Sequence, residues 1–414
     1  MQNVPKSLRL QIGLFGRTNV GKSSFLNMIC GQDFAITSPV PGTTTDVVEK
    51  TMELLPVGPV VFLDTAGVDD ISQLSDLRLK KTNKIFDRAD IFVLIIEPNV
   101  WTNFEEDVLA QAKRRKTPVI VVINKIDRKK PSDVFIKKIK TYISTAMLCS
   151  SLDKIKRDEY ITVFKELVMQ LCPEEFLNLP PILGDLIPAK GCVVLIVPID
   201  YEAPKGRIIL PQVQCVRDAL DHNSACVVVK ESEYSLFLEN LKKKPDLVVC
   251  DSQVVDKMVK ETPKNVKCTT FSILFSRYKG DLLEQVKGAL AIKKLKPGDK
   301  VLIAEACNHH AIEGDIGRIK IPLWLKKYVG GELKIDTCAG RNYPENLKEY
   351  KVIIHCGACM ITRREMLWRL YEAENKEVPI TNYGVAISVM KGVLERVLEP
   401  FDDILKVYQS LERK

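Results

Sequence analysis

The chain has 414 residues, 46% of them hydrophobic and 28% charged, a composition that excludes a wholly disordered or collagen-like protein. Its net charge of +8 is small for this length and argues against nucleic-acid binding, which needs clustered Lys and Arg. No run of about 18 apolar residues is present, and residues 1–10 lack the apolar core of a signal peptide. We therefore expect a cytoplasmic protein without a membrane partner.

Alternating strand and helix patterns predict three α/β domains, at residues 1–178, 179–280 and 281–414. A proline-rich stretch over 172–188 breaks the periodicity and marks the first boundary. In the first domain, short β-branched runs predict buried parallel strands with helices between them, which is the pattern of a doubly wound sheet. These strands are Leu10–Phe15, Val60–Leu63, Ile91–Ile96 and Val119–Ile123, and the helices are Lys22–Cys30 and Glu105–Arg115.

A glycine-rich motif, residues 16–23, lies between the first strand and the first helix and has the spacing Gly-x-x-x-x-Gly-Lys-Ser. Its glycines let backbone N–H groups surround phosphates at the positive end of the helix. Lys22 would reach the β- and γ-phosphates, and the Ser23 hydroxyl would bind Mg²⁺. The expected phosphate-binding residues are Gly16, Asn19, Val20, Gly21, Lys22, Ser23 and Ser24.

Two further motifs complete a hydrolytic site. Asp64-Thr65-Ala66-Gly67 ends the strand Val60–Leu63, so Asp64 can hold Mg²⁺ through water and the Gly67 N–H can contact the γ-phosphate. The Pro-bounded loop Gly42–Asp46 suits a switch segment, in which Thr44 is the expected Mg²⁺ ligand. The predicted catalytic residues are Lys22, Thr44, Asp64 and Gly67.

The motif Asn124-Lys125-Ile126-Asp127 ends the strand Val119–Ile123 and selects the base. An ionised Asp accepts two hydrogen bonds at once, which matches the N1–H and the exocyclic amine of guanine, whereas adenine has no such pair of donors. The sequence therefore predicts a site for GTP and Mg²⁺, with Asn124, Lys125 and Asp127 at the base.

These motifs resemble those of the Era, EngA and TrmE group of P-loop GTPases, over about the first 170 residues. The resemblance implies a further motif that supports the guanine, for which Ser150-Ser151 is the best candidate. Val68 stands where Ras-like enzymes have the Gln that orients the attacking water. The negative charge at the phosphates during hydrolysis must therefore be compensated by another group. The resemblance also implies that Asn19 helps bind a potassium ion in place of an arginine finger. A role in RNA or ribosome maturation, with a structural zinc site, is the alternative function.

The second domain shows strand and helix patterns but no phosphate loop and no catalytic constellation, so we expect it to serve assembly as a homodimer or higher oligomer. Its strands are expected at Val193–Val197, Cys226–Val229 and Leu247–Cys250, its helices at Leu210–Leu220, Tyr234–Leu241 and Val254–Lys260, and an apolar run at Phe271–Phe275. The third domain repeats the pattern. Its strands are expected at Val301–Ala304, Leu333–Ile335 and Val352–Ile354, and its helices near Trp324–Tyr328, Arg364–Glu374 and Val385–Leu398.

Cysteine and histidine gather in two loops of the third domain, at residues 307–310 and 355–359, each directly after a predicted strand. The carboxyl ends of parallel strands meet at one edge of a sheet, so these loops can share a site. Structural zinc would use Cys307, Cys356, Cys359 and one His. A redox dithiol would use Cys356 and Cys359 alone, and an iron–sulfur cluster would use all three cysteines. The residue types leave zinc and iron–sulfur equally open.

The spacing Cys-x-His, then 46 residues, then Cys-x-x-Cys, behind an Era-like GTPase and a middle α/β domain, resembles the HydF family of iron-only hydrogenase maturation GTPases. The resemblance implies a last domain whose mainly parallel sheet carries a 4Fe-4S cluster on Cys307, Cys356 and Cys359, with His309 and His355 nearby. It further implies dimerisation through the middle domain, and a scaffold or carrier that delivers a di-iron precursor to apo-hydrogenase alongside radical-SAM maturation enzymes. The fourth cluster ligand stays open among His309, His355, Glu305, Asp185 and an exogenous group, and Cys338 is interpreted as a bystander.

Overall fold

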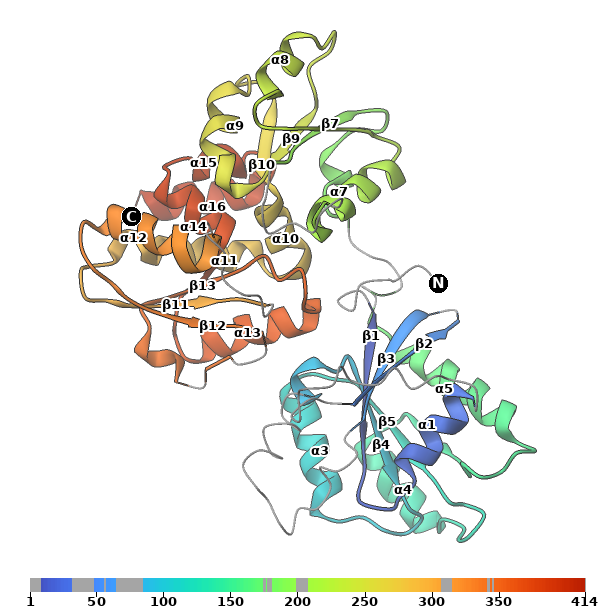
Figure 1. Ribbon diagram of the computed structural model, residues 1–414. Helices are drawn as coiled ribbons and strands as arrows, with labels where there is room; N and C mark the ends of the chain where they lie inside the picture. The colour runs from blue at the N-terminus through green and yellow to red at the C-terminus, as the bar shows by residue number, and fades with distance from the viewer. Residues whose placement is uncertain are drawn as a thin grey trace. The chain divides into compact units, whose positions relative to one another are not determined.

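The computed structural model describes residues 9–31, 48–55, 57–64, 85–173, 176, 181–198, 208–306, 315–340, 343–344 and 346–413. The chain divides into two compact units between Leu179 and Pro180, inside the proline-rich stretch (Figure 1). No helix within these ranges has both the length and the apolar character of a membrane span.

The first unit is built on a sheet with the order β2-β3-β1-β4-β5-β6, in which β2 runs antiparallel to β3 and the other neighbours are parallel. Its strands are β1 (Leu10–Phe15), β2 (Val48–Leu54), β3 (Gly58–Asp64), β4 (Ile91–Ile96), β5 (Val119–Ile123) and β6 (Ala146–Leu148). The four predicted parallel strands and the doubly wound fold class are confirmed. The strand order reverses at β1, and in open parallel sheets the carboxyl end of the strand at this switch point is where ligands bind.

Helices cover both faces of this sheet. They are α1 (Lys22–Cys30), α3 (Asn103–Arg114), α4 (Asp133–Tyr142) and α5 (Arg157–Leu171). Figure 1 shows α1 and α5 on one side of the strands and α3 on the other. The core follows the same division, because Phe25 of α1 packs edge-on against Phe164 of α5, while Val108 of α3 and Phe135 of α4 belong to the cluster on the opposite face. Because both faces of the sheet are buried, its parallel strands are nearly continuous apolar runs.

The second unit begins with a four-stranded parallel sheet of order β10-β9-β7-β8. Its strands are β7 (Cys192–Ile196), β8 (Ala225–Val229), β9 (Leu247–Cys250) and β10 (Lys267–Thr270), and its helices are α7 (Leu210–Asp221), α8 (Tyr234–Glu239), α9 (Val255–Glu261) and α10 (Phe271–Lys279). The apolar run Phe271–Phe275 is the start of α10. Thr270 ends β10 and caps this helix, since its hydroxyl accepts a hydrogen bond from the Ile273 N–H at 3.2 Å.

A second four-stranded parallel sheet follows, with the order β12-β11-β13-β14. Its strands are β11 (Lys300–Ala304), β12 (Lys334–Cys338), β13 (Val352–His355) and β14 (Ile380–Asn382). The helices are α11 (Leu282–Ala289), α12 (Ile321–Val329), α13 (Arg363–Asn375), α14 (Tyr383–Met390), α15 (Leu394–Leu398) and α16 (Asp402–Glu412), with a π-helical turn at Ile316–Lys320 before α12. Short 3₁₀ turns lie at Gly184–Leu186, Ser252–Val254, Leu290–Lys294 and Leu347–Glu349.

The prediction of one helix over Val385–Leu398 is wrong. The chain forms two helices there, α14 and α15, which are separated at Gly392. Gly392 has φ +69°, a left-handed conformation that glycine adopts without steric cost and that ends a helix.

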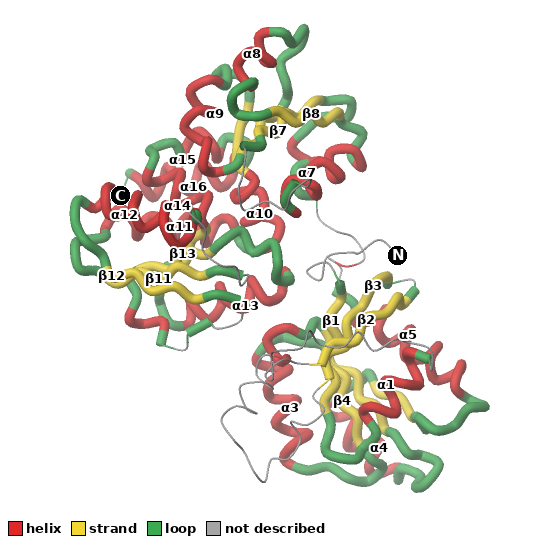
Figure 2. Tube along the Cα trace, viewed as in Figure 1, coloured by secondary structure: helices red, strands yellow, loops and turns green. Residues whose placement is uncertain are grey.

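The two sheets of the second unit share one hydrophobic core. Helix α13 covers one face of the last sheet, and α11, α12 and α14 cover the other (Figure 2). The core on the latter face continues without a break into the first sheet of the unit through α10. Polar contacts add to this packing, because the Asn382 side chain and the Gly384 N–H both donate to Ser272 of α10, at 2.7 and 3.0 Å. Helix α10 therefore belongs structurally to both sheets.

Candidate functional site

The glycine-rich loop after β1 has the backbone geometry of a phosphate cradle. Gly16, Asn19 and Gly21 have φ values of +154°, +64° and +98°, and a Cβ atom on Gly16 would lie 2.5 Å from the Ile95 carbonyl oxygen. Lys22 begins α1 and is buried, with Nζ donating to the carbonyl oxygens of Gly16 and Arg17 at 2.7 and 3.0 Å. The lysine is thus folded back onto its own loop, in the place where it can meet a phosphate.

Asn124 ties three loops of the first unit together. Its side-chain N–H donates to the Val20 carbonyl oxygen at 2.9 Å, and its Oδ1 accepts from the backbone N–H and the hydroxyl of Ser151 at 3.0 and 2.9 Å. The loops after β1, β5 and β6 are therefore joined at the carboxyl edge of the sheet. Asn124 was predicted from its motif and Ser150-Ser151 as the pair that supports the guanine, but the contact between Ser151 and Asn124 was not predicted.

Asp127 and Lys125, the other predicted base-contacting residues, also have defined partners. The Ser150 hydroxyl donates to Oδ1 of Asp127 at 2.7 Å, and Ser150 is itself buried. Lys125 pairs with Glu97 at 2.5 Å and donates to the carbonyl oxygen of Asn19. Asp127 is exposed, so its carboxylate can meet a base from solvent while Ser150 fixes its orientation.

An ion pair behind the phosphate loop was not expected. Arg17 pairs with Glu105 at 2.9 Å, and Glu105 is fully buried at the start of α3, where it also closes a capping box with Thr102. The spacing Thr102-x-x-Glu105 is a recognisable capping signal, but nothing in the sequence indicates the contact with Arg17. The ion pair links the phosphate loop to α3.

Asp64 is the last residue of β3 and is buried, and it pairs with Leu14 of β1. Thr44, Gly67 and Val68 lie outside the described residues, so the predicted switch loop and the γ-phosphate contact stay predictions.

The second candidate site lies at the carboxyl edge of the last sheet. Glu305, Cys338, His355 and Asn382 end or directly follow four adjacent parallel strands, and Cys356 begins the Cys-x-x-Cys loop after β13. Sγ of Cys356 accepts a hydrogen bond from the Ala306 N–H at 3.0 Å. Burial raises the pKa of the Cys356 thiol, whereas the backbone N–H groups of Ala358 and Ala306 act in the opposite direction. Backbone donors of this kind suit a thiolate that binds a metal or a cluster.

His355 is fully buried and both of its ring nitrogens have partners. Nε2 lies 2.9 Å from the Arg369 guanidinium, which can only donate, so Nε2 accepts and the proton is on Nδ1. Nδ1 then donates to the Cys356 carbonyl oxygen at 2.8 Å. Burial, followed by the charge of Arg369, lowers the pKa of His355 to about 3, so the ring is neutral. In this arrangement His355 orients the loop, and its role as a cluster ligand stays a prediction.

The other described candidates for a fourth ligand are each held by an arginine. Glu305 is buried and pairs with Arg318 at 2.9 Å. Asp185 pairs with Arg277 through both oxygens, at 2.7 and 2.8 Å. Cys307 and His309 lie outside the described residues. Among the described residues, those of this sheet edge included, no three His, Cys, Asp or Glu side chains are grouped closely enough to hold a metal ion.

Lys279, the last residue of α10, has only 2% of its surface exposed and lies beneath the Cys-x-x-Cys loop. Nζ donates to the Ile361 carbonyl oxygen at 2.8 Å. Burial lowers the pKa of Lys279 to about 8, and Cys359 and Glu365 act against this shift. Burial raises the pKa of the Cys359 thiol to about 11, with Lys279 as an opposing influence. No motif in the sequence indicated a role for Lys279.

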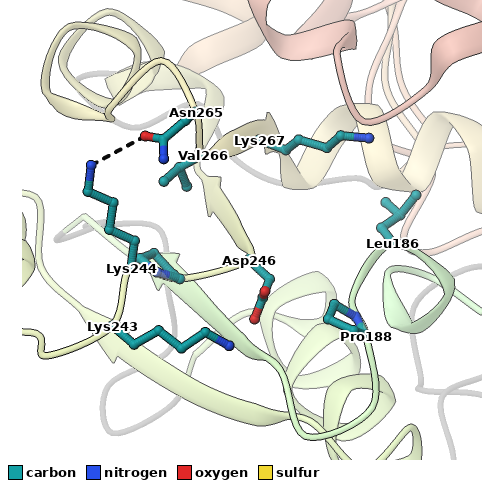
Figure 3. Close-up of a pocket in the computed structure, with 9 residues that line it drawn as sticks. Leu186, Pro188, Lys243, Lys244, Asp246, Asn265, Val266 and Lys267 are labelled. Atoms are coloured by element: carbon teal, nitrogen blue, oxygen red, sulfur yellow. Dashed lines mark hydrogen bonds between the residues drawn. The ribbon is translucent and has the colours of Figure 1, made fainter.

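A pocket of about 450 Å³ lies in the second unit, at the amino ends of β7, β9 and β10. Figure 3 shows Asp246 and Lys267 at its rim and Lys244 bonded to Asn265, at 3.3 Å. Lys243, Lys244 and Lys267 line the pocket and are exposed. Ligand sites of parallel α/β sheets form at the opposite, carboxyl edge, so this pocket is not a candidate active site.

Comparison with protein families matches three parts of the chain. Residues 11–125 match the model of a 50S ribosome-binding GTPase. Residues 182–280 match the hydrogen maturase F dimerization domain, and residues 283–400 match the hydrogen maturase F tetramerization domain. The predicted GTPase domain, with its binding of GTP and Mg²⁺, and the predicted homo-oligomeric assembly are thereby confirmed.

Curated relatives align with the GTPase part. The tRNA modification GTPase MnmE of Synechococcus sp. (strain JA-3-3Ab) is 42% identical over 122 residues, which are 28% of this chain and 26% of the relative. The MnmE protein of Nostoc sp. is 39% identical over 120 residues, again 28% of this chain and 26% of the relative. The chain thus spans about a quarter of the length of the curated relatives it matches. Among solved structures, Era of Aquifex aeolicus is 21% identical with a TM-score of 0.32, covering 60% of this chain and 97% of that chain.

Proposed function

Because the chain belongs to the hydrogen maturase F family, whose two domain models together match more than half of it, we propose that it is a GTPase and 4Fe-4S scaffold that matures iron-only hydrogenase. The observation that carries the proposal is the pair of maturase-specific domains behind a GTPase domain. We assign residues 1–178 to GTP binding, 179–280 to dimerisation and 281–414 to cluster binding.

GTP would bind across the carboxyl edge of the first sheet. Lys22 is positioned by Gly16 and Arg17 to contact the β- and γ-phosphates, and Ser23, at the start of α1, would hold Mg²⁺. Asp64, with Thr44 and Gly67 from the undescribed segments, would complete the metal and γ-phosphate contacts. Asp127 would accept hydrogen bonds from guanine, in an orientation fixed by Ser150. The hydrogen bond from Asn124 to Val20 holds the base-binding loop against the phosphate loop.

Potassium activation of hydrolysis is part of the proposal. Asn19 is exposed in the phosphate loop, and its left-handed backbone turns its carbonyl oxygen towards Lys125. This leaves the Asn19 side chain as a neutral oxygen donor beside the phosphates, which suits a monovalent cation.

The cluster would be held by Cys307, Cys356 and Cys359. The described part of this donor set fits, because Cys356 accepts N–H hydrogen bonds and Cys359 lies beside a buried ammonium group. When bound through three thiolates, a 4Fe-4S cluster offers one iron to an exchangeable ligand, and this suits a carrier of a di-iron precursor. His355 and Arg369 position the loop, while His309 stays a candidate ligand.

Assembly is supported by an edge of the first sheet of the second unit that has no strand partner among the described residues. Strand β8 is the outer strand, with the sequence Ala-Cys-Val-Val-Val, and Val228 is 46% exposed. Val213 and Leu220 of the neighbouring α7 are also exposed. An apolar edge strand of this kind would aggregate unless it is covered, so we propose that β8 pairs with a second copy of the chain.

The partners that this function requires are apo-hydrogenase and the radical-SAM maturation enzymes, and the expected location is the cytoplasm. A hydrogenase maturation assay tests the proposal. Apo-hydrogenase mixed with this protein and the radical-SAM enzymes should gain hydrogen-evolving activity, and the Cys356→Ser variant should supply none. Full maturation by that variant would overturn the carrier role.

A further inference from the structure

The pocket at the amino ends of β7, β9 and β10 is built by three loops that lead into neighbouring strands of one sheet. The loop before β7 contributes Leu186 and Pro188, the loop between α8 and β9 contributes residues 243–246, and the loop between α9 and β10 contributes residues 265–267. Its volume of about 450 Å³ lies within the range of small-molecule sites in proteins, roughly 300–1,000 Å³. The pocket can therefore hold a small ligand.

Hydrogen bonds to the backbone fix two of these loops. The Asp246 carboxylate accepts a hydrogen bond from the Cys192 N–H at 2.8 Å, and the Asp246 N–H donates to the Cys192 carbonyl oxygen at 2.9 Å. The Arg396 guanidinium donates to the carbonyl oxygens of Pro263 and Val266, at 3.0 and 2.7 Å. The walls of the pocket are thus formed before a ligand arrives, so binding requires little ordering of the backbone.

The three loops carry a strong excess of positive charge. Residues 186–191, 242–246 and 263–267 contain six lysines and one aspartate. The aspartate is Asp246, and one of its carboxylate oxygens is already engaged by the backbone. Figure 3 shows Lys243, Lys267 and Asp246 around the same pocket. A concave surface with this charge concentrates anions from solution.

The lysines of the pocket are weakly compensated by the protein itself. Within the described ranges neither Lys243 nor Lys244 forms an ion pair, and Lys244 donates to the neutral side-chain amide of Asn265 at 3.3 Å. Lys267 lies 4.0 Å from Asp402, and both side chains are at least half exposed, so this ion pair is weak. Like charges that lie close together repel one another, and a bound anion would remove this repulsion.

We propose that this pocket binds a small molecule that carries two or more phosphoryl groups, which Lys243 and Lys267 contact. Lysine is a compact point charge that suits phosphate, whereas arginine has the planar fork that matches a carboxylate, and no arginine lines the pocket. The apolar part of the lining can cover an uncharged part of the ligand, and it consists of Leu186, Pro188, Pro245 and Val266. The proposal does not depend on the proposed function.

Pyrophosphate is the probe, and titration calorimetry of the full-length protein counts the molecules bound per chain. The test variant is Lys243→Gln/Lys267→Gln. The matched control is Lys230→Gln/Lys260→Gln, which removes the same charge from the same domain. Lys230 follows β8 and Lys260 lies in α9, and both are exposed and do not line the pocket.

The wild type and the control should each bind one more pyrophosphate per chain than the test variant. The phosphate loop of the first unit is the same in all three proteins, so any pyrophosphate that it binds is counted equally. Malonate, a dicarboxylate, should not occupy the additional site at the same ionic strength.

Asp246→Asn gives a change in the opposite direction. The asparagine keeps an oxygen acceptor for the Cys192 N–H but loses the negative charge beside the ligand. It should bind the additional pyrophosphate about fivefold more tightly, which is the effect of removing one like charge a few ångströms away in water.

An equal number of pyrophosphates in the wild type and in Lys243→Gln/Lys267→Gln would overturn the proposal. An equal loss in the control would do the same, because it would reveal a diffuse effect of net charge. Malonate that binds as tightly as pyrophosphate would overturn the assignment to phosphoryl groups, and a weaker affinity of Asp246→Asn would contradict the placement of the anion beside this carboxylate.

Discussion

The hydroxyl of Ser150 donates a hydrogen bond to Oδ1 of Asp127 at 2.7 Å, so a buried side chain after β6 orients an exposed carboxylate after β5. The neighbouring Ser151 holds Asn124 in the same way, through its backbone N–H and its hydroxyl. The guanine site is therefore arranged before the nucleotide arrives, and its two key side chains depend on two consecutive serines.

Replacement of Asp127 by Asn should abolish the preference for GTP. The variant loses a charged acceptor that pairs with two donors of guanine, at a cost of about 2–5 kcal/mol in binding. Isothermal titration with GTP and ATP measures the effect. Asp107→Asn, on the exposed face of α3, is the control and should bind GTP as the wild type does. Wild-type protein that binds ATP as tightly as GTP would refute the assignment of Asp127.

The Ser150→Ala variant should weaken GTP binding by about 1 kcal/mol, the net contribution of one hydrogen bond. The loss is smaller than for Asp127→Asn, because the carboxylate remains and loses only its fixed orientation. The same titration measures it. An unchanged affinity would mean that Asp127 does not need Ser150 to read the base.

Potassium should accelerate GTP hydrolysis relative to sodium at constant ionic strength. The Asn19 side chain provides the oxygen ligand for the cation, so Asn19→Ala should hydrolyse GTP at one low rate in both salts. Initial rates of phosphate release measure the difference. Identical wild-type rates in potassium and sodium would rule out this mechanism.

The edge strand β8 predicts how the chain dimerises. The Ala225 N–H and the Val229 carbonyl oxygen bond towards β7, so the alternation of a parallel strand directs the N–H of Val228 to the unpaired side. Val228→Pro removes that donor and should give monomers or a weakened assembly, whereas Val228→Thr keeps the donor and the branched shape. Light scattering reports the mass of each. A Val228→Pro protein with the wild-type mass would place the interface elsewhere.

Buried cysteines of the middle domain should affect stability at alkaline pH rather than metal binding. Burial raises the pKa of Cys268 to about 12, so the folded chain keeps a proton that the unfolded chain loses above about pH 9. The free energy of unfolding should therefore fall as the pH rises beyond 9, by up to about 1.4 kcal/mol per pH unit for this thiol. Cys268→Ala should show a shallower fall in denaturant titrations between pH 8 and pH 11. Parallel curves for both proteins would contradict the assignment.

The elements and motifs that depend on local sequence patterns could be predicted from the sequence. Buried parallel strands are continuous β-branched runs, and the motifs stand directly after them, so β1, β3, β4 and β5 and their loops were predicted. Strand β2 was missed because its sequence, Val-Glu-Lys-Thr-Met-Glu-Leu, carries three charges and lies at the sheet edge.

Contacts made by tertiary packing could not be predicted. Arg369 lies 14 positions after His355 and on another element. No sequence pattern therefore reveals that its guanidinium donates a hydrogen bond to Nε2 of the imidazole. Lys279 looks like the end of an amphipathic helix, and only the packing of α10 under the Cys-x-x-Cys loop makes it part of a site. Cys307 and His309 lie outside the described residues, so their roles continue to rest on the motif.

The iron and acid-labile sulfide content of anaerobically reconstituted protein tests the central claim most directly. We expect about four irons and four sulfides per chain in the wild type and neither in Cys356→Ser. This variant should still hydrolyse GTP, because the two sites lie in separate units. Cys338→Ser, which changes a thiol at the end of β12, should keep the full cluster. Stoichiometric zinc without iron in the wild type, or a full iron content in Cys356→Ser, would contradict the account.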